Sequence, residues 1–355
     1  MIPLREKIGQ MLIMGFTGCE IDKHSPVACW LKKDGLGGVL LFDYDITTNC
    51  YGKNLRDRDQ IKRLTYQLTH YSESRTPAEE KPSLFIALDY EGGAVDRLAK
   101  IPGCYRTLSA SEQALLTEDE QHKEIHQMSM TLKDLGFNLN FAPVLDLNLD
   151  NEQGIIGKLG RSFSNNPMLV VRAAKQFVNA FAQEGIICVY KHFPGHGSAA
   201  GDTHHGFVDV TDSYQSKELE PYVILLEDNK MPVMVMTAHV INRQLDPSGL
   251  PATLSHVILT GLLRDQMGFD GVIVSDDLQM QAISAHFSLD EALSLTINAG
   301  ADMLIFGNQL GYNSATEVVD HIEKLVNSGA IKLSRIDQSY QRILRLKQCQ
   351  SMLSL

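Results

Sequence analysis

Eight short apolar runs recur along the chain, and this repeat constrains the fold more than any other feature. Each run is almost continuously apolar rather than alternating, as expected for strands that are covered on both faces. Such strands are typical of parallel sheets in α/β folds. The runs are MLIMGF (11–16), GGVLLF (37–42), LFIALD (84–89), LNFAPV (139–144), IICVYK (186–191), VMVMTA (233–238), GVIVSD (271–276) and DMLIFG (302–307).

Segments with helical spacing of apolar residues separate these runs. Four of them end at a glycine, the residue that most often terminates a helix before the next strand. The segments are 56–71, 119–136, 166–185, 255–268 and 288–300, and the glycines are Gly136, Gly185, Gly268 and Gly300. After the eighth run, residues 313–329 and 334–347 predict two further helices that close the fold.

Eight strands, each followed by a crossover, predict an α/β fold of the (β/α)8 TIM-barrel type. A chain of 355 residues is normal for one such barrel. A doubly wound open sheet is the alternative, but no Gly-x-Gly-x-x-Gly follows the first run. We find no linker or internal repeat. We therefore predict a single domain over residues 1–355, with closing helices over 315–350.

Polar side chains follow most of the runs, at the end where each strand should stop. The carboxyl ends of the strands carry the active site in TIM barrels. One polar residue there often caps a helix, but the same pattern at several strands indicates a functional site. These residues are Asp89, Glu91, Asp146, Lys191, His192, His239, Asp276, Asp277 and Asn308.

The segment GHGSAAGDTHHG, residues 195–206, carries further titratable groups after the fifth run. Asp202 and His204 are two residues apart, a spacing that lets the carboxylate hold the imidazole and raise its basicity. The segment is rich in glycine and poor in large apolar residues, so we predict a mobile loop.

Asp276 and Asp277 stand side by side after the seventh run. Neighbouring residues of a strand point to opposite faces, so we expect one carboxylate to face the barrel axis and the other to cap the following helix. A lone inward carboxylate facing a histidine acid indicates a nucleophile and a proton donor for acetal hydrolysis.

Two other classes of barrel protein compete with this interpretation. A metal hydrolase could use His192, His196, His204, His239 and Asp276 as zinc ligands. The sequence lacks both His-Glu-x-x-His and a His-x-His after the first run, which disfavours that class. A non-catalytic sugar-binding barrel would not need a full set of acid, orienting and nucleophilic groups. We predict no metal and no cofactor.

The motifs KHFPGHG (191–197), Asp202-Thr-His204, VSDDLQM (274–280) and LDYEGG (88–93) closely resemble glycoside hydrolase family 3, over nearly the whole chain. The resemblance is closest to its single-domain β-N-acetylglucosaminidases. It implies that Asp276 is the nucleophile and that His204 is the general acid/base, oriented by Asp202. It also implies that the N-acetylglucosamine hydroxyls bind a set of polar residues. This set is Asp89, Arg97, Arg161, Lys191 and His192.

Two departures from the family pattern stand near these positions. Ala94 occupies a place where the family often has arginine, and the segment IGKLGRSF before Phe163 is two residues longer than usual. Arg161 is therefore a less direct match than Lys191. If His204 is not the acid, Glu91 is the next candidate.

The resemblance implies a retaining exo-β-N-acetylglucosaminidase that acts on small glycans, in cell-wall muropeptide recycling. A β-glucosidase or another β-glycosidase of the family is the alternative. Phosphate in place of water as the acceptor stays open, because a histidine acid repels a phosphate dianion less than a carboxylate does.

The net charge and the cysteine pattern limit the partners and the cellular compartment that we expect. The net charge is −11 without a Lys/Arg-rich run, which argues against nucleic acid. No apolar run is long enough for a membrane span. The six cysteines form no paired spacing, which favours reduced thiols in the cytoplasm over an extracytoplasmic home with disulfides. We expect a small glycan substrate and a monomer or weak homo-oligomer.

Overall fold

The computed structural model describes residues 2–74, 82–149, 154–200, 206–228 and 231–353. Within these ranges eight parallel strands form a closed barrel in the order β1-β2-β5-β8-β9-β11-β13-β14, with β14 paired to β1. Every predicted run overlaps one of them, which confirms the TIM barrel. The strands are β1 (Leu12–Gly15), β2 (Gly38–Leu40), β5 (Phe85–Leu88), β8 (Leu139–Asn140), β9 (Ile187–Phe193), β11 (Val233–Thr237), β13 (Val272–Asp277) and β14 (Met303–Phe306).

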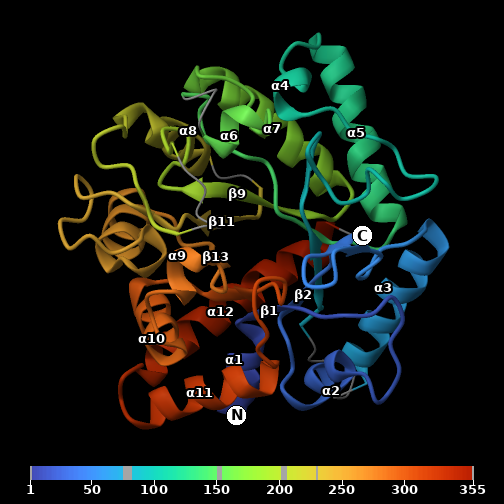
Figure 1. Ribbon diagram of the computed structural model, residues 1–355, viewed down its shortest axis with the longest axis vertical. Helices are drawn as coiled ribbons and strands as arrows, with labels where there is room; N and C mark the ends of the chain where they lie inside the picture. The colour runs from blue at the N-terminus through green and yellow to red at the C-terminus, as the bar shows by residue number, and fades with distance from the viewer. Residues whose placement is uncertain (1, 75–81, 150–153, 201–205, 229–230, 354–355) are drawn as a thin grey trace.

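Helices surround the barrel on its outer side (Figure 1). They are α1 (Leu4–Gln10), α2 (Pro26–Lys33), α3 (Arg58–Glu73), α4 (Ala110–Gln113), α5 (Glu118–Asp134), α6 (Ile155–Lys158), α7 (Pro167–Gln183), α8 (Glu220–Glu227), α9 (Gln281–Ser284), α10 (Leu289–Ala299), α11 (Ala315–Asn327) and α12 (Leu333–Leu353). The described ranges also contain the 3-10 helices η3 (Ser216–Leu219) and η4 (Ala252–Leu254) and the π-helix η5 (Val257–Gln266).

The predicted helices are all present, with sequence signals at their ends. In α5, Thr117 and Glu120 form a reciprocal capping box, and the chain leaves the helix through Gly136 at φ +82°. The prediction missed α2 and α8, which are short and carry proline in the first turn, and the single-turn helices α4, α6 and α9. It also expected an ordinary helix where η5 forms a π-helix.

Three pairs of short strands extend the loops that follow the barrel strands. β3 (Tyr44–Asp45) pairs with β4 (Cys50–Tyr51), and β6 (Tyr90–Gly92) pairs with β7 (Val95–Asp96), both antiparallel. β10 (Val208–Asp209) pairs with β12 (Val240–Ile241) in parallel. These pairs stiffen the loops at the end of the barrel where the polar residues were predicted.

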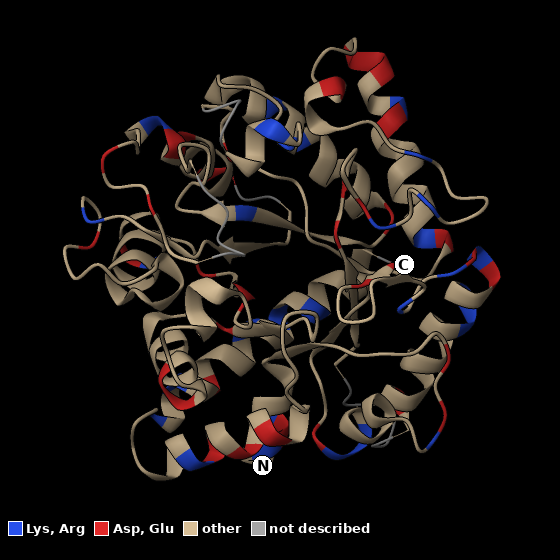
Figure 2. Cartoon of the chain, in the orientation of Figure 1, with Lys and Arg blue, Asp and Glu red and all other residues tan. Residues whose placement is uncertain are grey.

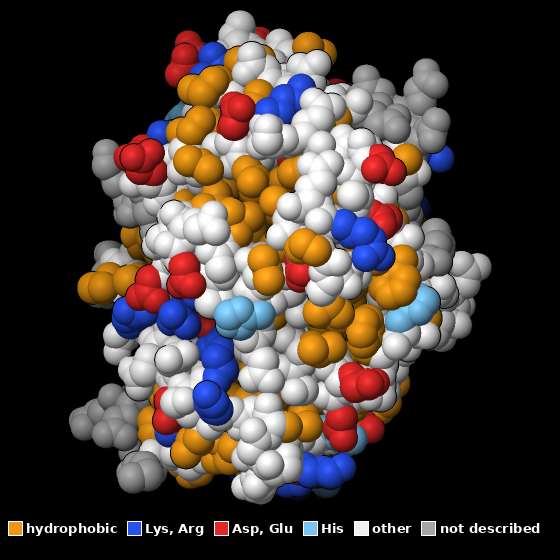
Figure 3. All heavy atoms as spheres, turned by 90° about the vertical axis from the view of Figure 1, so that its left-hand side faces the viewer, with side chains coloured by type: hydrophobic (Ala, Val, Ile, Leu, Met, Phe, Trp, Pro, Cys, Tyr) orange, Lys and Arg blue, Asp and Glu red, His pale blue; other side chains and the backbone are white. Residues whose placement is uncertain are grey.

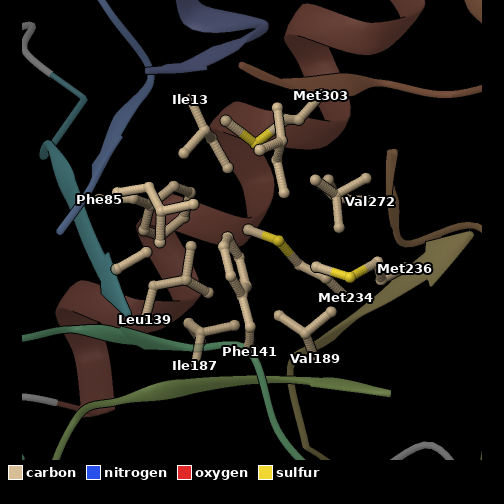
Figure 4. Packing of buried hydrophobic residues seen from close by; sticks show 14 of the residues in the cluster. Ile13, Phe85, Leu139, Phe141, Ile187, Val189, Met234, Met236, Val272 and Met303 are labelled. Carbon is tan, nitrogen blue, oxygen red and sulfur yellow. The ribbon is translucent and has the colours of Figure 1, made fainter. Parts of the chain in front are cut away.

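Large apolar side chains from the strands fill the barrel interior, as Figure 4 shows. Their close packing makes the barrel a solid core rather than a pore. The labelled residues are Ile13, Phe85, Leu139, Phe141, Ile187, Val189, Met234, Met236, Val272 and Met303.

Helix α12 closes the opposite, amino-terminal end of the barrel. Its Lys347 is 2% exposed and donates hydrogen bonds to Gln10 Oε1 and to the carbonyl of Gly37, both at 2.8 Å. The Lys347 Nζ also lies 4.8 Å from the centroid of the Phe85 ring. Through Lys347, α12 is thus tied to the amino-terminal ends of the strands; the predicted domain over 1–355 with closing helices over 315–350 stays a prediction.

The outer surface mixes charges and apolar groups. Acidic and basic residues alternate around the helices in Figure 2, without a stripe of Lys and Arg. On the face in Figure 3, hydrophobic side chains form several groups separated by polar atoms. No helix within the described ranges is long and apolar enough to cross a membrane. All six cysteines are described, and all are free thiols.

Candidate functional site

A cavity of about 280 Å³ lies at the carboxyl ends of the barrel strands. It collects side chains from the loops after β2, β5 and β14 and from the ends of β9 and β13. Six of the eight predicted site residues line it: Asp89, Arg97, Arg161, Lys191, His192 and Asp276. The other two, Asp202 and His204, lie outside the described residues.

Glu91, Arg161 and Lys191 form a buried cluster in the wall of the cavity. Two guanidinium nitrogens of Arg161 donate to Glu91: Nε to Oε2 at 2.8 Å and Nη2 to Oε1 at 2.7 Å. The Lys191 Nζ lies 2.6 Å from Glu91 Oε1. Glu91 follows β5 and Arg161 follows α6, so this cluster ties a long loop to the barrel.

The two cations fix the protonation state of Glu91. Burial acts to raise the pKa of Glu91, but Arg161 and Lys191 outweigh it and lower the pKa to about 2. Glu91 is therefore ionised at neutral pH and already accepts bonds from two cations. Glu91 in this state is unsuited to donate a proton, which disfavours the reserve candidate for the acid.

Asp89 connects this cluster to Arg97. The Asp89 Oδ1 lies 3.2 Å from Lys191 Nζ, and the Asp89 Oδ2 lies 3.2 Å from Arg97 Nη2. Burial acts to raise the pKa of Asp89, but Lys191 and Arg97 outweigh it and the pKa is lowered. Asp43, which the sequence analysis did not single out, lies 3.9 Å from Arg97 Nη1. The Asp43 Oδ1 atom is buried and has no hydrogen-bond partner among the described residues.

His192 is held in one orientation by Asp146. Its Nδ1 lies 2.6 Å from Asp146 Oδ2, and its Nε2 lies 3.4 Å from an Arg161 nitrogen. A carboxylate on one ring nitrogen and a donor on the other select the tautomer with hydrogen on Nδ1. Burial acts to raise the pKa of Asp146, but His192 and nearby N–H donors outweigh it and the pKa is lowered. Asp146 belongs to the site, although the predicted binding set omitted it.

His196 also lines the cavity, beside His192. The two ring centroids are 5.7 Å apart, and the backbone N–H of His196 donates to Asp146 Oδ1 at 2.8 Å. Burial, followed by the neighbouring His192, lowers the pKa of His196 to about 4. Its buried Nδ1 has no hydrogen-bond partner in the described part of the chain. His196 is therefore a neutral imidazole.

Asp276 and Asp277 end β13, and both line the cavity. The pairing of β13 with β14 shifts register between Val274 and Asp277, and the expectation that only one carboxylate faces the barrel axis stays a prediction. The expectation that Asp277 caps the next helix is wrong: α9 begins at Gln281, with Met280 as its N-cap. The Asp277 Oδ1 instead accepts from the N–H of Gln279 at 3.0 Å, within a turn.

The end of β13 is supported by β11. The Asp276 N–H donates to Thr237 Oγ1 at 3.3 Å, and the Asp276 Oδ1 accepts from the Asp277 N–H at 2.8 Å. The Nε2 of the buried His239 lies 2.9 Å from the backbone oxygen of Asp277. His239 thus holds the backbone beneath the two carboxylates.

The first half of the segment 195–206 is packed tightly. Residues 195–199 are buried, and an added Cβ at Gly197 would lie 2.1 Å from the Leu147 carbonyl oxygen. The predicted mobility is therefore wrong for this half, because its glycines allow close approach rather than looseness. The prediction for Asp202 and His204 falls outside the described residues.

Among the described residues, no group of three or more His, Cys, Asp and Glu side chains could hold a metal ion. The His192 ring interacts with Asp146, and the His239 ring interacts with Thr253 Oγ1 at 2.8 Å. These contacts engage the rings of two of the four histidines that a metal site would use. His196 contacts Asp146 through its backbone N–H, and His204 lies outside the described ranges.

Known proteins resemble this chain over most of its length. It is 34% identical over 306 residues to the β-hexosaminidase of Tolumonas auensis, covering 84% of this chain and 82% of that protein. It is 31% identical to β-hexosaminidase A of Pseudoalteromonas piscicida, over 89% of this chain. That match covers 54% of the relative, so this chain spans about half of its length.

A solved glycoside hydrolase family 3 β-N-acetylglucosaminidase from Paenibacillus sp. str. FPU-7 superimposes with a TM-score of 0.87 at 31% identity. The match covers 99% of this chain and 63% of that chain. The glycosyl hydrolase family 3 N-terminal domain matches residues 3–346. The resemblance in the motifs is thus confirmed, and the chain belongs to glycoside hydrolase family 3.

Proposed function

We propose that this protein is a retaining exo-β-N-acetylglucosaminidase that removes terminal N-acetyl-β-D-glucosamine from small glycans. The observation that carries the proposal is the convergence of six predicted site residues on one cavity at the carboxyl ends of the strands. Family membership and the β-hexosaminidase and β-N-acetylglucosaminidase names of its relatives support the same activity.

In the first step, the Asp276 carboxylate attacks the anomeric carbon as the bond to the leaving oxygen breaks. Protonated His204 gives its proton to that oxygen, and a glycosyl ester forms on Asp276. In the second step, neutral His204 takes a proton from water. The water oxygen bonds to the anomeric carbon, and the ester bond breaks. Two inversions leave the configuration unchanged.

The charge state of the cavity supports this division of roles. The pKa values of Asp89, Glu91 and Asp146 are all lowered, so these carboxylates accept hydrogen bonds and do not donate protons. Asp89 can accept from sugar hydroxyls, while Lys191 and Arg97 can donate to them. The acid must then be another group, and His204 with Asp202 as its orienting residue fits the motif.

A small cavity favours one terminal sugar rather than a run of sugars. Muropeptide recycling in the cytoplasm is the setting that we propose for this reaction. It rests on the resemblance in the motifs, and subcellular fractionation tests the location.

A panel of nitrophenyl glycosides, with and without phosphate, tests the proposed activity. We expect cleavage of the N-acetyl-β-glucosaminide well above the β-glucoside, and a β product seen first by proton NMR. Asp276→Asn prepared in parallel shows that the activity belongs to this protein. A preference for the glucoside, or an α product formed first, would overturn the proposal. A sugar phosphate product would replace hydrolysis with phosphorolysis.

A further inference from the structure

A buried carboxylate holds the segment that leads into Asp202 and His204. Glu218 lies in η3 and is 1% exposed. Its Oε2 accepts from the backbone N–H of Gly197 at 2.9 Å and of Ser198 at 3.3 Å. Its Oε1 accepts from the N–H of Gln215 at 3.3 Å. One carboxylate therefore joins the chain on both sides of the segment 201–205.

The glycines of KHFPGHG fit this contact. Gly195 has φ +132°, and an added Cβ there would lie 2.8 Å from the Glu218 Cβ and 2.9 Å from its Oε2. Any larger residue would push the carboxylate away from Gly197. The absence of a side chain at Gly195 is therefore needed for packing against Glu218, in addition to any catalytic role of the motif.

A small apolar cluster brings the same two flanks together. Ala199 stands before the segment 201–205, and Val210 and Tyr214 stand after it; all three pack in one cluster with Ala238 and Val240. The Tyr214 hydroxyl also donates to the Pro194 carbonyl at 2.9 Å. The hydrogen bonds of Glu218 therefore join the same two parts of the chain that this apolar cluster holds together.

Burying a carboxylate costs free energy, because the charged group loses its hydration. Burial raises the pKa of Glu218, and the contacts of its carboxylate within the described ranges are with backbone N–H groups rather than with a cation. Burying a charge without a cation destabilises a fold unless hydrogen bonds offset the loss of water. Apolar packing alone would hold together the residues before and after the segment 201–205 without this desolvation cost. The specific gain from Glu218 is the fixed direction of the Gly197 and Ser198 N–H groups.

We propose that Glu218 is a positioning residue that sets the approach of His204 to the leaving oxygen. This inference rests on the proposed function, in which His204 is the acid. Glu218 is not among the residues that line the cavity, so it would act through the backbone of Gly197 and Ser198. Its loss should impair proton donation and spare the attack by Asp276.

The test compares two leaving groups in the same enzyme preparation. A sugar alkoxide needs protonation to leave, whereas nitrophenolate departs as a stable anion. We would measure kcat/KM for N,N′-diacetylchitobiose and for nitrophenyl N-acetyl-β-glucosaminide, and take the ratio. The ratio is independent of the amount of folded enzyme, so mere destabilisation does not change it.

In Glu218→Gln the amide would present N–H groups to backbone donors. We expect the ratio to fall at least about tenfold, a part of the hundred- to ten-thousandfold that general acid help is worth. His204→Ala should lower the ratio further. Glu120→Gln is the matched control: it changes the glutamate of the capping box at Thr117, on α5, and should leave the ratio unchanged.

The outcomes separate the inference from the proposed function. If His204→Ala lowers the ratio and Glu218→Gln does not, the positioning role is wrong and the proposed function stands. If His204→Ala leaves the ratio unchanged, the assignment of the acid is wrong and the inference falls with it. Should Glu218→Gln fail to fold, Glu218→Asp keeps the charge and shortens the reach. It should give the same pattern more weakly, and an unchanged ratio would refute the role.

Discussion

Replacing Lys347 with methionine should change how the stability of the fold depends on pH. Lys347 is buried at the amino-terminal end of the barrel, and burial lowers the pKa of its amine to about 7. Its two hydrogen bonds, to Gln10 and Gly37, match the two N–H groups of a neutral amine. Methionine is similar in length and cannot titrate.

The sign and size of the effect follow from proton binding. Between about pH 7 and pH 10.4 the unfolded chain keeps the proton on Lys347 and the folded chain releases it, so stability rises with pH. The slope from this group is about 1.4 kcal/mol per pH unit near pH 8–9.5, and the full pKa difference corresponds to about 5 kcal/mol. Below about pH 7 both states are protonated and the slope disappears.

Urea unfolding from pH 7 to pH 10 measures this difference. The free energy of unfolding of the wild-type chain should rise relative to that of Lys347→Met by about 3–4 kcal/mol over this range. At pH 10 methionine should be the less stable of the two, because the Gly37 carbonyl and the Gln10 amide oxygen lose their donor. Parallel pH profiles for the two proteins would refute the reasoning and show that Lys347 keeps its charge when folded.

Three further predictions concern the cavity. Asp276→Asn should lower kcat at least about a thousandfold, because it removes a covalent step; substantial residual activity would reject it as the nucleophile. Glu91→Gln removes the carboxylate that pairs with the buried cations of Arg161 and Lys191. The free energy of unfolding measured in urea should therefore fall by about 3 kcal/mol. The substitution should also lower kcat/KM equally for sugar and nitrophenyl leaving groups, and a loss confined to the sugar would restore Glu91 as the acid. Exhaustive chelation should leave activity unchanged, and a loss that zinc reverses would favour a metal hydrolase.

The barrel could be predicted because its signals are local. Each strand is a short apolar run, and the longer helices show apolar spacing and end near glycines such as Gly136 and Gly185. The helices α2 and α8 were missed because only two turns each separate their proline-marked starts from the next loop. So short a segment carries too few apolar positions to show a helical period.

The residues of the site could be predicted from the sequence, but the contacts between them could not. Asp89, Lys191 and Asp276 follow strands, so their convergence at one end of the barrel was expected. The partner of Arg161 is Glu91, 70 residues away in the sequence, and no local pattern indicates that contact. The role of Asp146 could have been found by asking which acidic residue at a strand end holds His192.

The Asp276–Asp277 pair shows the limit of a strand rule. Alternation along β13 predicts opposite directions, but the pairing with β14 shifts register at this end, and both residues line the cavity. Register shifts depend on how two strands pair, which the sequence of one strand does not reveal. The same limit applies to Glu218, whose contact with Gly197 joins two loops.

Trapping the glycosyl-enzyme tests the central claim most directly. A fluorinated N-acetylglucosamine derivative with a good leaving group should form a slowly hydrolysed ester on the nucleophile. Digestion and mass spectrometry then locate the labelled residue. The account predicts a label on Asp276 that adds one sugar unit and is absent from Asp276→Asn. A label on Asp277 or on another residue would contradict it.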